Sequence, residues 1–283
     1  MKSFLLFVSR KKPSDWVRFL LVWAAGISTI AILLYLVIFI LVRGIPHINP
    51  ALFELEYTPE NQSLLPALIT TVLMVFLTLL IAVPFGVATA IYLVEYASRG
   101  SRLVKAIRMT TETLAGIPSI VFGLFGYIFF CSWLGWGKSI LAGSSTLAIM
   151  ILPLIIRTTE ESLKSIPDAY REGSFALGAG RLRTVFRVIL PSATPGIFAG
   201  VILSVGRIVG ETAALLFTIG SVIQIPKSLY SQGRTLALHV YNLATEGLYT
   251  NQAYATAVVL LVVVLCINWL SSRAERKFAD KLK

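Results

Sequence analysis

The sequence predicts an all-α integral membrane protein with six transmembrane helices. Of its 283 residues, 56% are hydrophobic and only 14% are charged, whereas soluble domains carry roughly 25% charged residues. The apolar residues also gather in six stretches, each close to or above the roughly 20 residues that cross a bilayer as a helix. How Lys and Arg are distributed between these stretches then predicts the orientation of the helices.

Each apolar stretch is expected to form one transmembrane helix, with the surplus ends of the longer stretches lying at the interface. One stretch, 188–226, is charge-free except for Arg207 and Glu211. The other five contain no charged residue: 19–42, 61–94, 113–137, 139–156 and 247–272.

The first stretch resembles a signal peptide, because basic residues precede it (Lys2, Arg10, Lys11, Lys12 and Arg18). Its apolar part exceeds the usual 7–15 residues, roughly, and no A-x-A-like cleavage site follows, so we predict a retained helix. We therefore expect an N-terminal unit over 1–63, a transmembrane core over 64–272 and a basic tail over 273–283.

The connections differ sharply in positive charge. Of the 25 Lys and Arg residues, 20 fall in 1–18, 99–108, 157–187 and 273–283, and only four fall in the other connections. Because cytoplasmic loops are enriched in Lys and Arg, both termini are predicted to be cytoplasmic. This asymmetry accounts for the net charge of +11 without a nucleic-acid partner.

Two segments depart from simple spans. Around Pro118, the sequence GIPS (116–119) could unwind the third span or merely kink it. In the outer connection, the segment 229–248 is moderately apolar and is expected to hold a short re-entrant or interfacial segment.

The largest inner connection is patterned as a helix–turn–helix. Pro167 suits a first helical turn, and Gly178 and Gly180 then break the helix. Leu182, Val185, Phe186 and Ile189 follow with helical spacing, and Pro191 is expected to close the second helix. Such an element could lie on lipid headgroups or dock a cytoplasmic partner.

The stretch REGSFALGAGRLRTVFRVILP resembles the EAA loop of ABC importer permeases, here within 160–191. The motif residues that would contact an ATPase subunit are Glu172, Gly173, Ser174, Gly178, Leu190 and Pro191. Gly173 and Ser174 stand where the motif has alanines, and they remain small enough to let the helix enter a groove.

Further segments, TETLAGIPSIVFGLFGY (111–127) and GRIVGETAALLFT (206–218), are similar to the phosphate-specific importer permeases, most closely the A-type. The resemblance implies a type I permease bundle that forms a heterodimer with a C-type permease. It also implies two ATP-binding subunits, an external phosphate-binding protein and a location in a bacterial or archaeal plasma (inner) membrane. The alternatives are a molybdate or sulfate permease, the C-type paralogue, a stand-alone secondary transporter, or a membrane sensor subunit.

The residues do not support catalysis or a cofactor. In SWLGWGKS (132–139), Ser132 replaces the first glycine of a phosphate-binding loop. Cys131 and Cys266 are isolated, and His47 and His239 lie in different connections, so no metal site is expected.

The two charges in the fifth apolar stretch belong to one helical stripe. A continuous helix would align Gly200, Ser204, Arg207, Glu211, Ala214 and Thr218. Arg207 and Glu211 could neutralise each other, or the stripe could line a translocation pathway through Ser204, Arg207, Glu211 and Thr218. We favour the pathway, because charges inside membranes are usually functional. At the inner ends of neighbouring spans, Thr110, Thr111 and Glu112 could line an exit or cap a helix, and Arg157 is expected to anchor at the interface.

Overall fold

The computed structural model describes residues 13–98 and 100–281, and in these ranges the chain forms helices joined by loops. Five helices are long and apolar enough to cross a membrane, and a bent pair provides a sixth crossing if it counts as one span. The prediction of an all-α membrane protein is therefore confirmed. Lys2, Arg10, Lys11 and Lys12 lie outside the described residues.

The elements follow the predicted order. The long helices are α2 (Pro13–Gly44), α3 (Leu65–Ile91), α4 (Arg102–Gly116), α6 (Ile140–Lys164), α9 (Leu190–Val209) and α12 (Thr250–Lys281). The shorter ones are η1 (Ile45–His47), η2 (Pro50–Phe53), η3 (Tyr92–Tyr96), α5 (Ser119–Gly126), η4 (Tyr127–Trp133), α7 (Asp168–Ala176), α8 (Arg181–Thr184), η5 (Val185–Ile189), α10 (Ala213–Thr218) and α11 (Leu236–Glu246).

The bundle is built around α3, α6 and α9, and small residues bring these helices close together. A Cβ added to Gly86 of α3 would lie 2.6 Å from Ile155 of α6. One added to Gly200 of α9 would lie 2.1 Å from Thr158 of α6. Small residues at such crossings let helix backbones approach and gain dispersion contacts, which lipid alone cannot replace.

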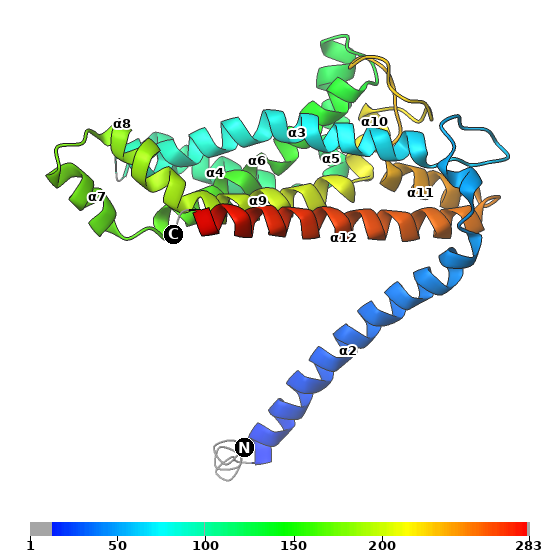
Figure 1. Ribbon diagram of the computed structural model, residues 1–283, viewed down its shortest axis with the longest axis horizontal. Coiled ribbons are helices and arrows are strands. Elements are labelled where there is room, and N and C mark those ends of the chain that lie inside the picture. The colour runs from blue at the N-terminus through cyan, green and yellow to red at the C-terminus, as the bar shows by residue number, and fades with distance from the viewer. Residues whose placement is uncertain (1–12, 99, 282–283) are drawn as a thin grey trace.

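Helix α2 leaves this bundle (Figure 1). None of the residues in its most apolar window is buried against the rest of the chain. It joins the bundle near its C-terminal end, where Phe39 makes an edge contact with Tyr254 of α12.

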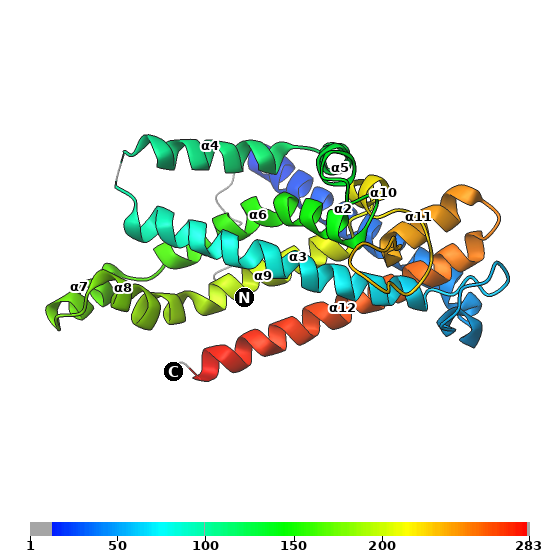
Figure 2. The ribbon, with the colours of Figure 1, turned by 90° about the horizontal axis from the view of Figure 1, so that it is seen from above.

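The third crossing is broken rather than gently kinked. Helix α4 and the segment Ser119–Trp133 meet at an angle of 105°, and α5 is seen nearly end-on beside α4 (Figure 2). The backbone of Ile117 is extended, with ψ 131°, as expected for a residue that precedes proline. Pro118 therefore turns the chain sideways.

The fifth stretch is not one uninterrupted helix, which corrects the sequence prediction at both ends. Helix α9 ends at Val209 with Gly210 as its C-cap, and the chain re-enters a helix only at Ala213. At the other end, α8, η5 and α9 follow one another without a break, so Pro191 does not close the second helix. The wider π-turn of η5 lies directly before Pro191, where the missing N–H and the ring would otherwise disrupt an α-helix.

At the opposite end from α7, the predicted apolar segment contains α11. Thr235 caps its first turn by accepting from the Leu238 N–H at 3.4 Å, and Gly247 ends it with a positive φ of 72°. Leu236 and Leu238 are fully buried. Helix α11 therefore packs as part of the bundle.

Candidate functional site

A charged cavity of about 390 Å³ lies between α4, α6 and α9. Four cationic and three carboxylate side chains line it, which leaves one excess positive charge: Arg108, Arg157, Lys164, Arg207, Glu112, Glu160 and Glu161. In a chain so poor in charge, this concentration marks the cavity as the leading candidate for a functional site.

Most of the cavity's cations are held by ion pairs. The Glu160 carboxylate accepts from both Arg108 and Lys164, each at 2.6 Å, and its side chain is only 12% exposed. Arg157 pairs with Glu161 at 3.0 Å, one turn along α6. Arg157 therefore also lines the cavity, and its predicted role as an interfacial anchor stays a prediction.

Arg207 is placed differently. It lies exposed in the last turn of α9, where its charge also suits the negative end of the helix dipole. Within the part of the chain that the structure describes, no ion pair joins it to Glu211. The Glu211 carboxylate instead accepts from the Ala214 N–H at 3.1 Å and caps α10. Of the two interpretations of this pair, the geometry does not support self-neutralisation.

Ser204 and Thr218, the other two predicted pathway residues, are fully buried. Their hydroxyls donate within their own helices, to the carbonyls of Gly200 and Ala214, both at 2.9 Å. The predicted stripe does not form a single exposed face, because α9 ends before Glu211 and because Gly200 packs against Thr158.

The exposed face of α9 has Ala199 and Leu203 in place of Gly200 and Ser204 of the predicted stripe, and it shares Arg207 with that stripe. It carries Ser192, Gly196, Ala199, Leu203 and then Arg207. Sequence reasoning missed this face, although its small residues recur at helical spacing just as the buried ones do. Tertiary packing decides which of two adjacent small-residue stripes faces outward.

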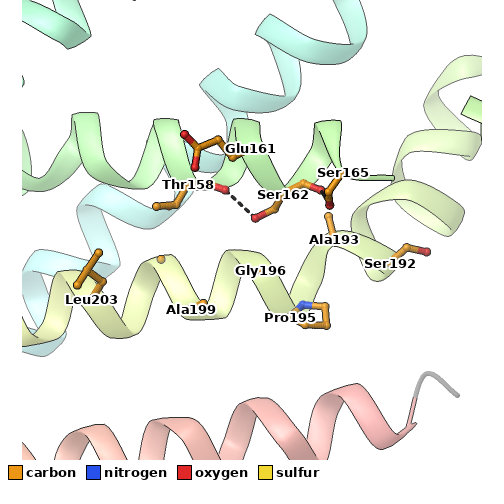
Figure 3. A pocket seen from close by; sticks show the side chains of 11 residues that line it. Thr158, Glu161, Ser162, Ser165, Ser192, Ala193, Pro195, Gly196, Ala199 and Leu203 are labelled. Carbon is orange, nitrogen blue, oxygen red and sulfur yellow. Dashed lines mark hydrogen bonds between the residues drawn. The ribbon is translucent and has the colours of Figure 1, made fainter. Parts of the chain in front are cut away.

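A groove of about 540 Å³ runs along this face, between α6 and α9 (Figure 3). Hydroxyl groups line it from both helices: Thr158, Ser162 and Ser165 from α6 and its C-cap, and Ser192 from α9. Glu161 lines both this groove and the charged cavity. The groove and the cavity therefore adjoin at Glu161.

Helix α7 and the turn after it project from one end of the bundle (Figure 1). Glu172, Gly173 and Gly178 are exposed, and Leu177 is 90% exposed. A groove of about 460 Å³, lined by Tyr170, Gly173, Leu177 and Val188 among others, opens beside α7. An apolar side chain as exposed as Leu177 favours a docking surface.

Three other predicted coupling residues are less accessible. Ser174 shares a hydrogen bond of 2.8 Å with Thr184 of α8 and so fastens α7 to the next helix. Leu190 and Pro191 are half-buried in the first turn of α9. The structure therefore brings Glu172, Gly173 and Gly178 to the tip and leaves Leu190 and Pro191 at its base.

The cavity contains residues for which the sequence offered little signal. Thr111 and Glu112 line the cavity, which agrees with the interpretation that they line an exit. Arg108, Glu160 and Lys164 come from two elements far apart in sequence, and only the fold brings them together. Spacing within α6 could have identified Glu160 and Lys164 as a pair, but not their contact with Arg108.

Long apolar helices that surround a charged cavity, with an exposed helix pair at one end, define a membrane transport component. Residues 82–280 match the family described as binding-protein-dependent transport system inner membrane component. The chain is 36% identical over 222 residues to the probable ABC transporter permease protein YqgI of Bacillus subtilis, covering 71% of this chain and 75% of that protein. It is 32% identical over 289 residues to the phosphate transport system permease protein PstA of Yersinia pestis, covering 98% and 96%.

Among solved structures, the chain is similar to one from a bacterial alginate ABC transporter in complex with an alginate-bound periplasmic protein. The TM-score is 0.70 at 18% identity, covering 93% of this chain and 95% of that one, a likeness of fold. The chain belongs to the binding-protein-dependent transport system inner membrane component family. It is a multi-pass, non-catalytic permease subunit of the inner membrane, and the resemblance found in its motifs is confirmed.

Proposed function

We propose that this chain forms the membrane path for inorganic phosphate in an ATP-driven importer. The observation that carries the proposal is the charged cavity, with its excess positive charge and an arginine that has no carboxylate partner among the described residues. Its relatives named as phosphate permeases support phosphate as the anion.

The cavity suits brief contact with an anion rather than storage. Arg157 is paired with Glu161, and Arg108 and Lys164 share the one carboxylate of Glu160. These cations are therefore already engaged, and the shared carboxylate leaves one excess positive charge. Arg207 supplies charge-assisted hydrogen bonds to phosphate oxygens, for which its planar guanidinium is well shaped. A pathway must release its anion, and a single unpaired cation allows that. Selection among oxyanions then belongs to an external binding protein.

The partners follow from the exposed surfaces. The α7 tip, with Glu172, Gly173 and Gly178, docks on an ATP-binding subunit, of which the complex holds two copies. A second, C-type permease completes the path, because the groove between α6 and α9 is open on one side. The uncovered α2 adds apolar surface suited to contact with that second permease and with lipid.

In the proposed orientation both termini are cytoplasmic. Helix α12 ends near α7 (Figure 1), so the C-terminus and the docking tip share one side. The test uses single cysteines at Glu56 and Ala176, with Cys131 and Cys266 replaced by alanine. An impermeant thiol reagent should label the first in sealed cells and label the second only after lysis. Labelling at Ala176 from outside would reverse the orientation.

The transport proposal is tested by co-expressing the chain with its genomic neighbours and reconstituting the complex in liposomes. Phosphate delivered with the binding protein should stimulate ATP hydrolysis and phosphate uptake. Stimulation by molybdate or sulfate instead would reassign the anion. Uptake driven by an ion gradient without any ATPase would support the secondary-transporter alternative.

A further inference from the structure

Arg171, the residue directly before Glu172, turns inward while its neighbours face outward. All three guanidinium nitrogens donate hydrogen bonds. Nε and Nη2 reach the Glu95 carboxylate at 3.1 and 2.7 Å. Nη2 also donates to the Leu163 carbonyl and Nη1 to the Ile166 carbonyl, both at 3.0 Å. We call Arg171 with these three acceptors the Arg171 clamp.

The acceptors come from two transmembrane helices. Glu95 lies in η3, the π-turn that continues α3 at the α7 end of the bundle. Leu163 belongs to the last turn of α6, and Ile166 lies in the link to α7. Carbonyls at the end of a helix have no partner within it, so Arg171 satisfies groups that α6 leaves open. One side chain thus fastens α7 to α3 and α6 together.

The clamp is largely shielded from water, which strengthens it. The Arg171 and Glu95 side chains are 15% and 8% exposed. By contrast, Asp168 contacts Arg171 at 3.2 Å but is 84% exposed, so solvent screens that contact. Only arginine offers a rigid fork of donors that can bind a carboxylate and two carbonyls simultaneously. The clamp should therefore be the main attachment of α7 to α3 and α6.

One side of α7 is therefore exposed, and the other is bound to the transmembrane helices. Tyr170, Glu172 and Leu177 are exposed toward a partner, while Arg171 holds the helix to α3 and α6. Helix α6 also carries Arg157, Glu160 and Glu161 in the charged cavity. We propose that Arg171 is the positioning residue through which displacement of α7 is transmitted to α3 and α6. The inference rests on the proposed ATP-driven function and names the mechanical link within it.

The test compares Arg171→Lys and Glu95→Gln with the control Asp168→Asn in the assembled complex. Lysine keeps the positive charge but cannot reach the carboxylate and both carbonyls from one nitrogen. Glutamine keeps the shape of Glu95 but removes its charge. Both variants should retain the ATPase subunits and basal ATP hydrolysis. Stimulation by phosphate-loaded binding protein should fall roughly three- to thirtyfold, whereas Asp168→Asn should behave as wild type.

A second measurement needs no transport substrate. Amide hydrogen exchange in α7 of the isolated permease should accelerate in Arg171→Lys and Glu95→Gln, and should remain unchanged in Asp168→Asn. Wild-type stimulation together with unchanged exchange in both clamp variants would overturn the proposal. If faster exchange accompanies full stimulation, the clamp is structural only and the proposal also fails.

Failure of the proposed function would be visible separately. If wild-type complex responds to another oxyanion, the clamp variants are judged on stimulation by that ion. If wild type responds to no anion and binds no ATPase, the importer proposal fails, and the clamp proposal fails with it.

Discussion

Two regions of the bundle hold their charged side chains differently. Between α4, α6 and α9, Arg108, Arg157 and Arg207 line an open cavity. At the α11 end, Arg234 is only 9% exposed. It donates to the Ser221 carbonyl at 3.0 Å and contacts His239 Nδ1 at 3.4 Å. In the orientation that its neighbours favour, the Asn242 amide oxygen accepts from Arg234 at 3.2 Å.

The comparison separates arginines available to a ligand from arginines that stabilise the fold. A guanidinium satisfied by a carbonyl and an amide has few donors left for an anion, and burial lowers its pKa. Arg207 has an exposed side chain and no ion-pair partner among the described residues. The cavity between α4, α6 and α9 is therefore suited to a ligand, whereas Arg234 at the α11 end stabilises the fold. Four predictions test this contrast, from the largest expected effect to the smallest.

The strongest test exchanges the two charges of the fifth stretch. Arg207→Glu combined with Glu211→Arg removes the cation from the cavity and the cap from α10. Phosphate uptake by proteoliposomes should fall roughly tenfold or more, because charge-assisted hydrogen bonds to the anion are lost, while the complex still assembles. Glu211→Gln is the matched control, since its amide oxygen can still accept from Ala214. Substantial phosphate uptake by the exchanged protein would instead support the interpretation in which Arg207 and Glu211 neutralise each other.

The second test concerns docking at the α7 tip. Gly178 has a φ of +81°, and a Cβ there would meet no atom of this chain. Gly178→Asp should therefore fold, at a cost of about 1 kcal/mol in backbone strain, yet place a charged side chain in the interface. ATPase co-purification and transport should be lost. Gly180→Ala is the control, because its φ of −72° suits any residue. Normal co-purification of the ATPase with the Gly178→Asp variant would argue against docking here.

The third test removes the buried arginine at the α11 end. Arg234→Met leaves the Ser221 carbonyl and the Asn242 amide without their donor, which should cost about 1–3 kcal/mol. The purified permease should lose thermal stability, whereas the protein that remains folded should transport at the wild-type rate per molecule. Arg207→Met should show the reverse. If both variants lost thermal stability equally, Arg207 and Arg234 would not differ in how much they stabilise the fold.

The smallest effect is a pH dependence. His239 is fully buried, and desolvation together with the nearby Arg234 charge lowers its pKa from 6.5 to about 4. The unfolded chain binds a proton as pH falls below 6.5, and the folded chain does not. Stability present above pH 6.5 is therefore lost progressively toward pH 4, by roughly 3 kcal/mol at most.

His239→Gln provides the reference for that measurement. The difference in melting temperature between wild type and variant should narrow or reverse as pH falls from 6.5 to 4, the range of the shifted pKa. Parallel curves over this range would show that His239 is not held neutral.

Local pattern alone was enough to identify the class of protein. Uninterrupted apolar stretches locate the spans, because a bilayer admits few other structures. The asymmetry of Lys and Arg predicts orientation in the same way. The motif around Glu172, Gly173 and Gly178 predicts a docking tip at α7, because its residues are nearly consecutive and its helix is short.

Contacts between distant segments required the fold. No spacing rule places Arg108 beside Glu160, or Arg171 against Glu95, because those pairs are 52 and 76 residues apart. The sequence likewise does not determine which of two neighbouring stripes on α9 is exposed. Gly200 and Ser204 pack inward because α6 approaches closely at Thr158, and Ala199 and Leu203 are left exposed in the groove. Helical periodicity shows that one face of a helix carries small and polar side chains. Whether that face is buried or exposed depends on which neighbouring helix can approach it.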